Sequence, residues 1–438
     1  MERILIGDLN THVGETVSIS GWVDVRRDQG KMVFFDFRDR SGAAQGVVLP
    51  GSEAIEVAKE IKVEYVVQVE GVVNKRPEKN IVASKQNGDI ELEIKKIEVL
   101  SAAEVLPFPK DEEVNLDTLL DNRPLTLRSQ RGRDMFAVQA TIVDAYRNSL
   151  KNQNFTEFQA PALVGSDAEG GAAVFKVNYF YDQTAYLATS PQLYKQIMVG
   201  VFERVFTIAR IFRAEKSATT RHLSELTQMD FEMGFINDES DVMAALETVI
   251  RDTVTAVAQI HTDVFSRFNV PVPKLGKKFP VLTLAQAHET LGVAPEDDMT
   301  PEHERAICEW ALTEHDSDFV FITRFPTAAR AFYTMSADET LSKGFDLLFR
   351  GLEINSGAQR IHNYGEMVAR IKERGMDPEK FSFYLQAFKY GIPPHGGCST
   401  GLERFTMKML DLPNVKEATL FPRDLNRIDV LLSKPEEA

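Results

Sequence analysis

Residues 205–232, VFTIARIFRAEKSATTRHLSELTQMDFE, constrain the fold more than any other stretch of this sequence. Apolar and polar residues alternate on both sides of a polar loop at 216–220, which predicts a hairpin of two strands. The two-residue period of a strand places Arg213 and Glu215 on one face of the first arm. On the second arm the same period groups His222, Leu226, Gln228, Asp230 and Glu232. A solvated hairpin also carries charges, but these alternate with Phe, Leu and Met, so we predict a partly buried binding site.

The same hairpin resembles motif 2 of the class II aminoacyl-tRNA synthetases. Its pattern FRAE...TTRHL.E....D.E is similar to the form of that motif in the aspartyl enzymes.

The composition allows two or three domains, since 43% of the 438 residues are hydrophobic and 26% are charged. A formal net charge of −15 argues against indiscriminate nucleic-acid binding, which needs an excess of Lys and Arg, but it leaves room for a local basic site. Cys308 and Cys398 are the only cysteines, and Met1-Glu2-Arg3 is not followed by an apolar run. We expect a cytoplasmic protein without a disulfide framework, a signal peptide or a membrane span.

Residues 1–105 are predicted to form a small β-barrel domain. Five short strands between 14 and 105 are separated by Gly, Asn, Asp and Pro, with one helical piece near 52–61. Phe34 shares a strand face with Asp36, and the cations nearby are Arg26, Arg27, Lys31 and Arg38. An aromatic ring among cations suits an oligonucleotide-binding (OB) barrel, in which bases stack on aromatic side chains. A scattered surface Phe explains these residues equally well.

Residues 106–132 contain three prolines and an acidic run, which predicts a linker, and a second domain is expected over 133–438. Helical spacing over 136–150 is followed by a strand pattern that Pro161 stops. This unit resembles motif 1, which forms the dimer interface in the family. The resemblance therefore implies a homodimer.

Two segments before the hairpin predict further site residues. Two glycines after Glu169 predict a loop of close approach, and Ser190-Pro191 predicts a helix start. Gln192 and Lys195, three residues apart, share a face of that helix. A single helix lysine is usually solvated, but AEGGA.VF.V.YF and SPQLYKQ resemble the aspartyl enzymes closely.

Asp346 and Glu353 lie seven residues apart across an Arg350-Gly351 turn, so a hairpin would place them roughly opposite each other on one face. Facing carboxylates repel unless one gains a proton or a cation lies between them. The surrounding apolar residues predict core strands, which favours a magnesium site over a pair of surface acids.

The segment YGIPPHGGCSTGLERF predicts a Gly-rich turn into a helix with Arg404 in its first turn. G..GLER resembles motif 3, and FPRD at 421–424 completes the match. The pattern at 241–268 predicts a long helix, while residues 271–320 show no motif.

The resemblance covers nearly the whole chain and implies an α+β protein. An N-terminal OB-fold barrel would precede a class II catalytic domain, an antiparallel six-stranded sheet flanked by helices. ATP would activate L-aspartate to aspartyl-adenylate, and the tRNA 3′ hydroxyl would then take the aspartyl group. The residues implied to be catalytic are Arg213, Glu215 and Arg404. The further implied ATP contacts are Arg221, His222, Leu226 and Glu353, and the implied Mg²⁺ ligands are Asp346, Glu353 and Ser356.

The resemblance also implies how aspartate is selected. Lys195 and Arg360 would hold its side-chain carboxylate, which the neutral amide of asparagine would leave partly unpaired. The remaining implied contacts are Glu169, Gln192, Arg213, Asp230 and Ser356. Asparaginyl-tRNA synthetases share the Gln359-Arg360 pair but typically lack a Lys at position 195.

Two alternatives stay open, an asparaginyl enzyme and a synthetase-like paralogue that only binds. The retained charges argue against the second. Three departures from the family pattern affect the pocket: Leu226 replaces a Phe, Thr189 a Gln and Ser399 a Gly.

The expected tRNA contacts lie in the barrel, with a base stacked on Phe34 and its neighbours read by Arg27 and Gln45. Those contacts cannot separate the aspartate and asparagine anticodons, which differ only in the third base. The loop at 76–87 is expected to read that base, and its Lys85 can donate to cytosine or uracil oxygens. We therefore favour a permissive enzyme that charges both tRNA(Asp) and tRNA(Asn).

Overall fold

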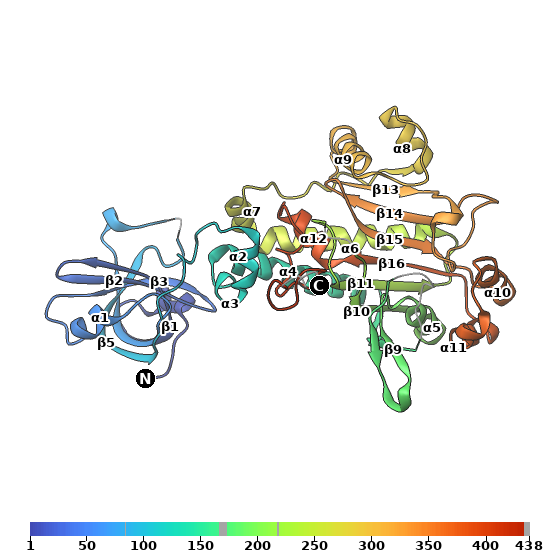
Figure 1. The fold of residues 1–438 in the computed structure, drawn as a ribbon. Coiled ribbons are helices and arrows are strands. Elements are labelled where there is room, and N and C mark those ends of the chain that lie inside the picture. Colours follow the sequence, from blue (N-terminus) through green and yellow to red (C-terminus); the bar gives the residue numbers. More distant parts are fainter. Residues whose placement is uncertain (84, 166–172, 217–218, 433–438) are drawn as a thin grey trace, which may run out of the picture. The chain divides into compact units, whose positions relative to one another are not determined.

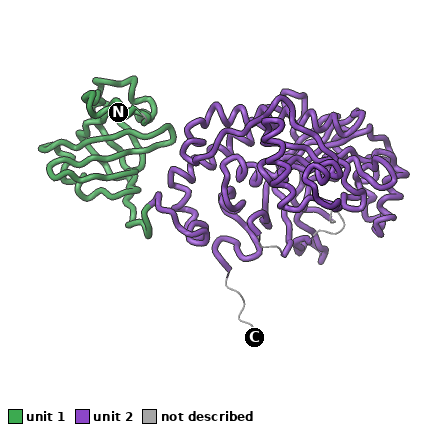
Figure 2. The backbone as a smooth tube through the Cα atoms, turned by 90° about the horizontal axis from the view of Figure 1, so that it is seen from above, with its two compact units in different colours: residues 1–109 green, residues 110–438 purple. Residues whose placement is uncertain are grey.

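The computed structural model of the protein describes residues 1–83, 85–165, 173–216 and 219–432. The chain divides into two compact units, 1–109 and 110–438 (Figure 2). Among the described residues, no helix combines the length and the apolar content needed to cross a membrane.

The first unit is a closed five-stranded barrel, so the predicted barrel is confirmed. Its strand order is β1-β2-β3-β5-β4, and alternate residues of β2 (Val33, Phe35 and Phe37) fill its interior. The strands are β1 (Thr16–Gln29), β2 (Met32–Asp39), β3 (Gly42–Val48), β4 (Val66–Lys75) and β5 (Ile90–Ser101). The helices of this unit are η1 (Ile6–His12), α1 (Ile55–Glu60) and η2 (Glu78–Asn80).

Arg38, which the sequence placed in an exposed cationic cluster, is buried. Its Nε donates to Asp24 at 2.6 Å and its NH2 donates to Glu64, while its guanidinium lies 5.2 Å from the centre of the Trp22 ring. A buried guanidinium needs carboxylate partners. One of them, Asp24, lies on β1 two residues after Trp22, which pairs with Arg38 across the barrel. Arg38 is therefore a structural residue of the barrel.

The second unit is built on an eight-stranded sheet of order β12-β13-β14-β15-β16-β11-β10-β6 (Figure 1). The six strands from β13 to β10 are antiparallel, as predicted, and β12 and β6 add parallel edges. Their bounds are β6 (Thr156–Glu157), β10 (Arg204–Phe212), β11 (Glu225–Gly234), β12 (Val281–Thr283), β13 (Phe319–Thr323), β14 (Gly344–Phe349), β15 (Leu352–Gln359) and β16 (His395–Gly401). A small sheet contains β7 (Leu163–Val164), β8 (Lys176–Asn178) and β9 (Thr184–Leu187).

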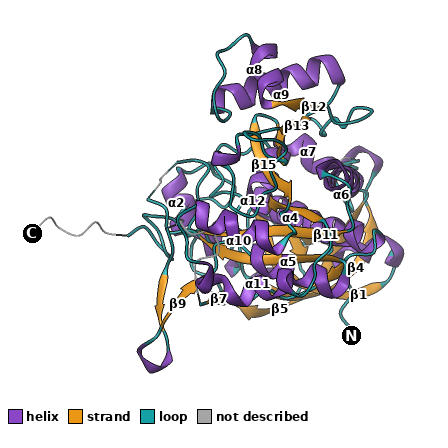
Figure 3. Ribbon diagram, turned by 90° about the vertical axis from the view of Figure 1, so that its right-hand side faces the viewer, coloured by secondary structure: helices purple, strands orange, loops and turns teal. Residues whose placement is uncertain are grey.

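Helices pack on the central strands of this sheet and beside its β13 end. The long helices α4 and α6 share one apolar cluster with the central strands, while α8 and α9 form a separate cluster beside β13 (Figure 3). The α-helices are α2 (Leu116–Asp121), α3 (Arg123–Thr126), α4 (Gln130–Asn152), α5 (Gln192–Phe202), α6 (Glu239–Ile260), α7 (Thr262–Phe268), α8 (Leu284–Leu291), α9 (Pro301–His315), α10 (Tyr364–Glu373), α11 (Ser382–Lys389) and α12 (Leu402–Met409). The 3₁₀ turns are η3 (Phe180–Asp182), η4 (Thr327–Ala329) and η5 (Pro378–Phe381).

The central hairpin is shorter than the alternation predicted. β10 ends at Phe212 and β11 begins at Glu225, so Arg213, Glu215 and His222 lie in the connecting loop. The backbone bond from Arg213 N to Ser224 O, at 2.9 Å, closes the base of this loop. Binding and catalytic residues are often placed on loops that a rigid scaffold positions.

The predicted register of the β14–β15 hairpin is wrong. The two-residue Arg350-Gly351 turn pairs Glu353 with Leu348, and a bulge between Leu347 and Leu348 then places Asp346 opposite Ser356. An extra residue on one strand shifts the pairing on one side of the bulge. Both carboxylates nevertheless line one cavity.

The segment 106–132, predicted as a linker, contains α2 and α3. The guanidinium of Arg123 donates to the backbone carbonyls of Glu417, Thr419 and Leu420, which docks α3 on the C-terminal part of the second unit.

We predict that Gly397→Ala destabilises the protein by about 1–3 kcal/mol, the usual cost of overpacking. A Cβ at Gly397 would lie 2.2 Å from a carboxylate oxygen of Glu232 and 2.2 Å from the Phe231 carbonyl oxygen. The matched control is Gly200→Ala on α5, where a Cβ meets nothing within 4 Å. Thermal unfolding should show a lower Tm for the first variant and an equal or higher Tm for the second. Equal Tm values in both variants would contradict the close packing of β16 on Glu232.

Candidate active site

A cavity of about 180 Å³ opens where the β10–β11 loop faces β15, β16 and α12. Every residue predicted to contact ATP lines it, and so does Ser356. The predicted residues in its wall are Arg213, Glu215, Arg221, His222, Leu226, Glu353, Ser356 and Arg404. The structure thus brings together residues separated by up to 191 positions along the chain, from Arg213 to Arg404.

The walls of this cavity carry three arginines, Arg213, Arg221 and Arg404, and three glutamates, Glu215, Glu353 and Glu403. Arg404, in the first turn of α12, donates to the backbone oxygen of Glu353 at 3.1 Å and to its carboxylate at 3.3 Å. Burial and the charge of Arg404 lower the pKa of His222 below its ordinary value of 6.5, so this ring is neutral at pH 7. The positive charge facing the cavity therefore comes from arginines, which suit phosphate groups.

Beside this cavity, four charged side chains are packed together almost without solvent contact. Lys195 Nζ donates to Asp230 Oδ2 at 2.9 Å and to the Cys398 carbonyl at 3.0 Å, and it lies 3.4 Å from Glu232 Oε2. Arg360 Nε donates to Glu232 Oε1 at 2.9 Å. Two cations therefore balance two anions, and we call Lys195, Asp230, Glu232 and Arg360 the buried charge cluster.

The cations of the cluster fix the charge of Glu232. Burial acts to raise the pKa of this carboxyl, but Arg360 and Lys195 outweigh burial and lower it. Arg360 also donates to the Gly397 carbonyl at 2.8 Å, and its guanidinium lies 5.3 Å from the centre of the Tyr333 ring. Glu232 thus stays ionised and holds Arg360 in one orientation.

The cluster touches the open cavity through β16. Ser399 lines the cavity, and its hydroxyl donates to Asp230 Oδ1 at 2.7 Å. Ser399 is one of the departures from the family pattern, and here it bonds to a residue predicted to bind aspartate.

Gln192 belongs to a buried polar chain behind the cluster. Its Nε2 donates to Gln196 Oε1 at 3.0 Å, which also accepts from Tyr384 at 3.0 Å. Gln196 Nε2 lies 2.9 Å from His395 Nε2, and His395 Nδ1 lies 2.8 Å from the Pro393 carbonyl oxygen. Burial lowers the pKa of His395 to about 4, so the ring is neutral at pH 7 and Nδ1–H is the donor to Pro393.

Asp346 and Glu353 line a second, polar cavity of about 110 Å³ together with Arg330. Partial burial and the nearby Asp346 charge raise the pKa of Glu353 to about 7. Arg330 donates to both carboxylate oxygens of Asp346, at 3.0 and 2.6 Å, and to the Ser356 hydroxyl at 3.2 Å. The carboxylates of Asp346 and Glu353 repel each other, and a bound cation would relieve that repulsion. Their oxygens fit Mg²⁺, which typically takes one or two protein carboxylates plus substrate phosphates.

Four of the predicted aspartate contacts are buried and line neither cavity, namely Gln192, Lys195, Asp230 and Arg360. Glu169 lies outside the described residues. Thr189 is buried, and within the described part of the chain its hydroxyl makes no hydrogen bond.

In the barrel, strand pairing brings three of the four predicted tRNA contacts together. Phe34 pairs with Arg27, and Gln45 pairs with Asp36. Arg27 donates to both oxygens of Asp36, at 3.1 and 2.7 Å, and to Gln45 at 3.3 Å. Lys85 is exposed in the loop before β5.

Asn87, two residues after Lys85 in that loop, is buried. Its amide donates to the carbonyls of Ile6 and Ala43 at 2.8 and 3.1 Å. Asn87 therefore holds the loop on the barrel.

Three charged residues of the site escaped the sequence analysis as site residues. Glu232 carried a usable signal, because it shares the two-residue period of Gln228 and Asp230. Arg330 and Glu304 carried none, since only the folded chain brings them to Asp346 and Arg221.

Comparisons with known proteins agree with this geometry. Residues 115–425 match the model of class II tRNA synthetases (D, K and N), and residues 17–100 match that of the OB-fold nucleic acid binding domain. The chain is 43% identical to the aspartate–tRNA(Asp/Asn) ligase of Thermus thermophilus, over 97% of this chain and 99% of the relative. It is 37% identical to the aspartate–tRNA(Asp) ligase of Thermococcus kodakarensis, over 95% and 96%. The asparaginyl-tRNA synthetase of Pyrococcus horikoshii complexed with asparaginyl-adenylate superposes with a TM-score of 0.89 at 31% identity, over 98% and 99%.

We predict that His395 makes stability depend on pH. Its pKa is about 4 in the folded protein against an ordinary 6.5, so its contribution is complete above pH 6.5 and is lost as the pH falls toward 4. Between pH 7 and pH 5 the loss is about 2 kcal/mol. The free energy of unfolding in urea should fall less over this range in His395→Gln than in the unchanged protein. His315→Gln, at an exposed position, serves as the control, and an equal fall in all three proteins would refute the assignment.

Proposed function

Because the chain belongs to the class II tRNA synthetases of the D, K and N group, we propose that it is an aspartate–tRNA ligase. The enzyme activates L-aspartate with ATP to aspartyl-adenylate and transfers the aspartyl group to the 3′ end of tRNA. The observation that carries this proposal is the buried charge cluster, whose cations Lys195 and Arg360 lie beside the arginine-lined cavity.

The cluster supports selection of a carboxylate side chain. Lys195 and Arg360 are desolvated and held by Asp230 and Glu232, so they are oriented before any ligand binds. An incoming carboxylate gains charge-assisted hydrogen bonds from them, whereas a carboxamide gains far less. Gln192 and Asp230 then offer oxygens to the α-ammonium group of the substrate.

The cavity supports the activation of aspartate by ATP. Two anions, the α-carboxylate of aspartate and the α-phosphate, must approach each other, and the protein contributes position and positive charge. Arg213 holds these two groups, while Arg221 and Arg404 hold the outer phosphates. Glu215 accepts a hydrogen bond from the adenine amino group, and Leu226 contacts the adenine ring with its aliphatic side chain.

Asp346, Glu353 and Ser356 would hold Mg²⁺, which supplies charge neutralisation for the phosphates when it is bound. In this proposal Arg330 orients the Asp346 carboxylate toward the second cavity, because it donates a hydrogen bond to each of the two carboxylate oxygens.

Asparagine as the substrate is the second candidate, because the asparaginyl-tRNA synthetase of P. horikoshii shares this fold. The buried Lys195 disfavours it, since an ammonium ion aimed at a neutral amide loses much of its interaction energy. A binding-only role is disfavoured because the charges that the mechanism needs are retained in the cavity.

The partners of the enzyme follow from the same reasoning. The barrel reads the anticodon through Phe34, Arg27 and Gln45, which strand pairing already places side by side. The α4–β6 unit resembles motif 1, so the active form is a homodimer, and sedimentation at twice the mass of the chain would support it. We also propose that the enzyme is cytoplasmic, because translation takes place there.

We predict that Arg213→Ala and Arg404→Ala each lower aspartate-dependent pyrophosphate exchange into ATP about 100-fold or more, because each removes a charge from the phosphate site. Arg210→Ala is the matched control, since Arg210 lies on β10 three residues before Arg213 with its side chain 54% exposed. The control should keep near-normal exchange, and circular dichroism should show all three variants folded. Near-normal exchange in the folded Arg213 or Arg404 variant would contradict the proposed roles, and exchange without aspartate would contradict the substrate.

We predict that the enzyme charges tRNA transcripts with anticodons GUC and GUU at comparable kcat/KM. The barrel residues proposed to contact the anticodon read the shared G and U, and Lys85 donates to the third base whichever pyrimidine is present. A transcript in which the shared U is replaced should lose charging, which controls for recognition by the barrel. A preference for GUC of roughly 100-fold, about 2.7 kcal/mol, would contradict the permissive third-base site.

A further inference from the structure

Helix α9 lies in the part of the chain without a motif, residues 271–320, yet one of its side chains reaches the cavity wall. Glu304 Oε2 accepts a hydrogen bond from Arg221 NH1 at 2.8 Å. The two side chains are only 11% and 24% exposed. This ion pair joins the loop between β10 and β11 to a helix 83 residues further along the sequence.

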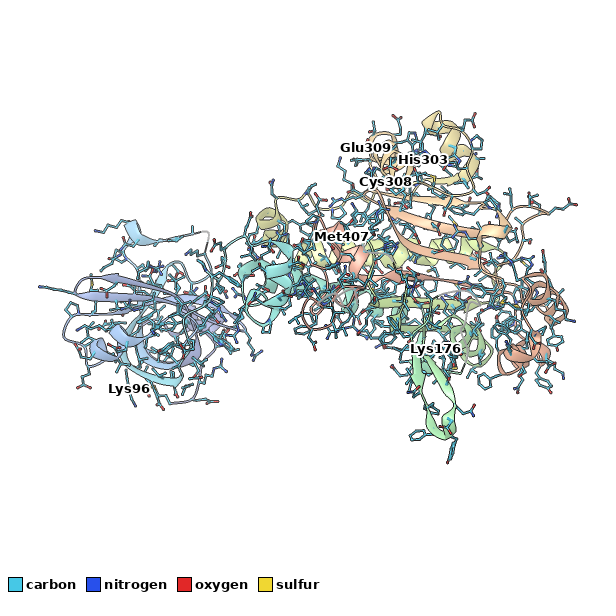
Figure 4. The ribbon with its side chains drawn as sticks, in the orientation of Figure 1. Lys96, Lys176, His303, Cys308, Glu309 and Met407 are labelled. Atoms are coloured by element: carbon cyan, nitrogen blue, oxygen red, sulfur yellow. The ribbon has the colours of Figure 1, made fainter. Side chains whose placement is uncertain are left out.

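Helix α9, which carries Glu304, is held against the sheet by apolar packing. Ile307, Cys308 and Ala311 of α9 pack in one apolar cluster with Val320 and Leu348 of the sheet. Figure 4 marks α9 by His303, Cys308 and Glu309, above β13. Thr300 caps the helix by accepting a hydrogen bond from His303 N at 3.2 Å.

In the described part of the loop, the contacts near Arg221 hold its backbone, and Arg221 N donates to the Thr219 hydroxyl at 3.2 Å. Val415 N donates to the Thr220 carbonyl at 3.0 Å, which fixes the backbone but not the guanidinium. An arginine side chain has many rotamers, and ordering it on a ligand costs binding energy unless a neighbour has already ordered it.

The geometry points to Glu304 as a positioning residue that orients Arg221 for the outer phosphates of ATP, an inference that rests on the proposed function. Arg221 lines the cavity and has five N–H donors; the bond to Glu304 engages Nη1, so the N–H groups of Nε and Nη2 can donate to a ligand. The segment without a motif thereby contributes to the ATP site through α9.

The test is the dependence of aspartate-dependent pyrophosphate exchange on ATP in the full-length chain. We expect Glu304→Gln, which keeps the shape and removes the charge, to raise the KM for ATP roughly tenfold, about 1.4 kcal/mol. The KM for aspartate should stay unchanged, because the buried charge cluster is untouched. Glu302→Gln is the matched control, since Glu302 lies in the same helical turn, is 71% exposed and pairs with Arg305 instead.

Calorimetric titration with ATP and magnesium tests whether Glu304 acts through Arg221. In an Arg221→Ala background, adding Glu304→Gln should weaken ATP binding no further, because coupled residues are not additive. Glu304→Asp, which keeps the charge with a shorter reach, should give an intermediate KM and serves if Glu304→Gln does not fold. An unchanged or lowered KM for ATP in the folded Glu304 variants, or additive losses in the double variant, would overturn the inference. Absence of exchange in the unchanged protein would instead refute the proposed function.

Discussion

The mutual neutralisation of four buried charges is the interaction on which the catalytic unit depends. Lys195 comes from α5, Asp230 and Glu232 from β11, and Arg360 from the end of β15. Each charge alone would be too costly to bury, but the paired ions share hydrogen bonds at 2.9 Å. Removing one partner leaves the others uncompensated, so the contacts that we propose for substrate recognition also stabilise the fold.

The sheet explains how this arrangement stays rigid while the phosphate site stays open. β16 lies between β11 and β15, and its Gly397 leaves room for the Glu232 carboxylate. The cluster is therefore held by three neighbouring strands. The arginines of the phosphate site come from a loop and a helix start instead, above the sheet, where a triphosphate can reach them. Many enzymes carry their binding and catalytic side chains on loops that a rigid scaffold positions.

The sequence predicted those features that depend on local periodicity or on the family motifs. The two-residue period placed Asp230 beside Gln228 correctly, and the six antiparallel strands are confirmed. It could not predict the bulge near Leu348, because an extra residue in one strand leaves the alternation of apolar and polar residues too short to show it. It also could not predict the partners of Arg38 and Arg221, since an ion pair between distant segments leaves no periodic signal. Long-range pairing of charges is thus the part of this site that needed the structure.

The same long-range pairing explains why a comparison of folds alone does not identify the amino-acid substrate as aspartate or asparagine. The asparaginyl-tRNA synthetase of P. horikoshii superposes with a TM-score of 0.89, so the sheet and its strand order are compatible with either substrate. What differs chemically between aspartate and asparagine is one charge, and a buried ammonium ion detects that charge most directly. In this chain Lys195 is held by Asp230 and by the Cys398 carbonyl, with Glu232 at 3.4 Å, so its ammonium group is fixed in one place. In the proposed function, specificity for aspartate would follow from the rigidity of the cluster as much as from the presence of the lysine.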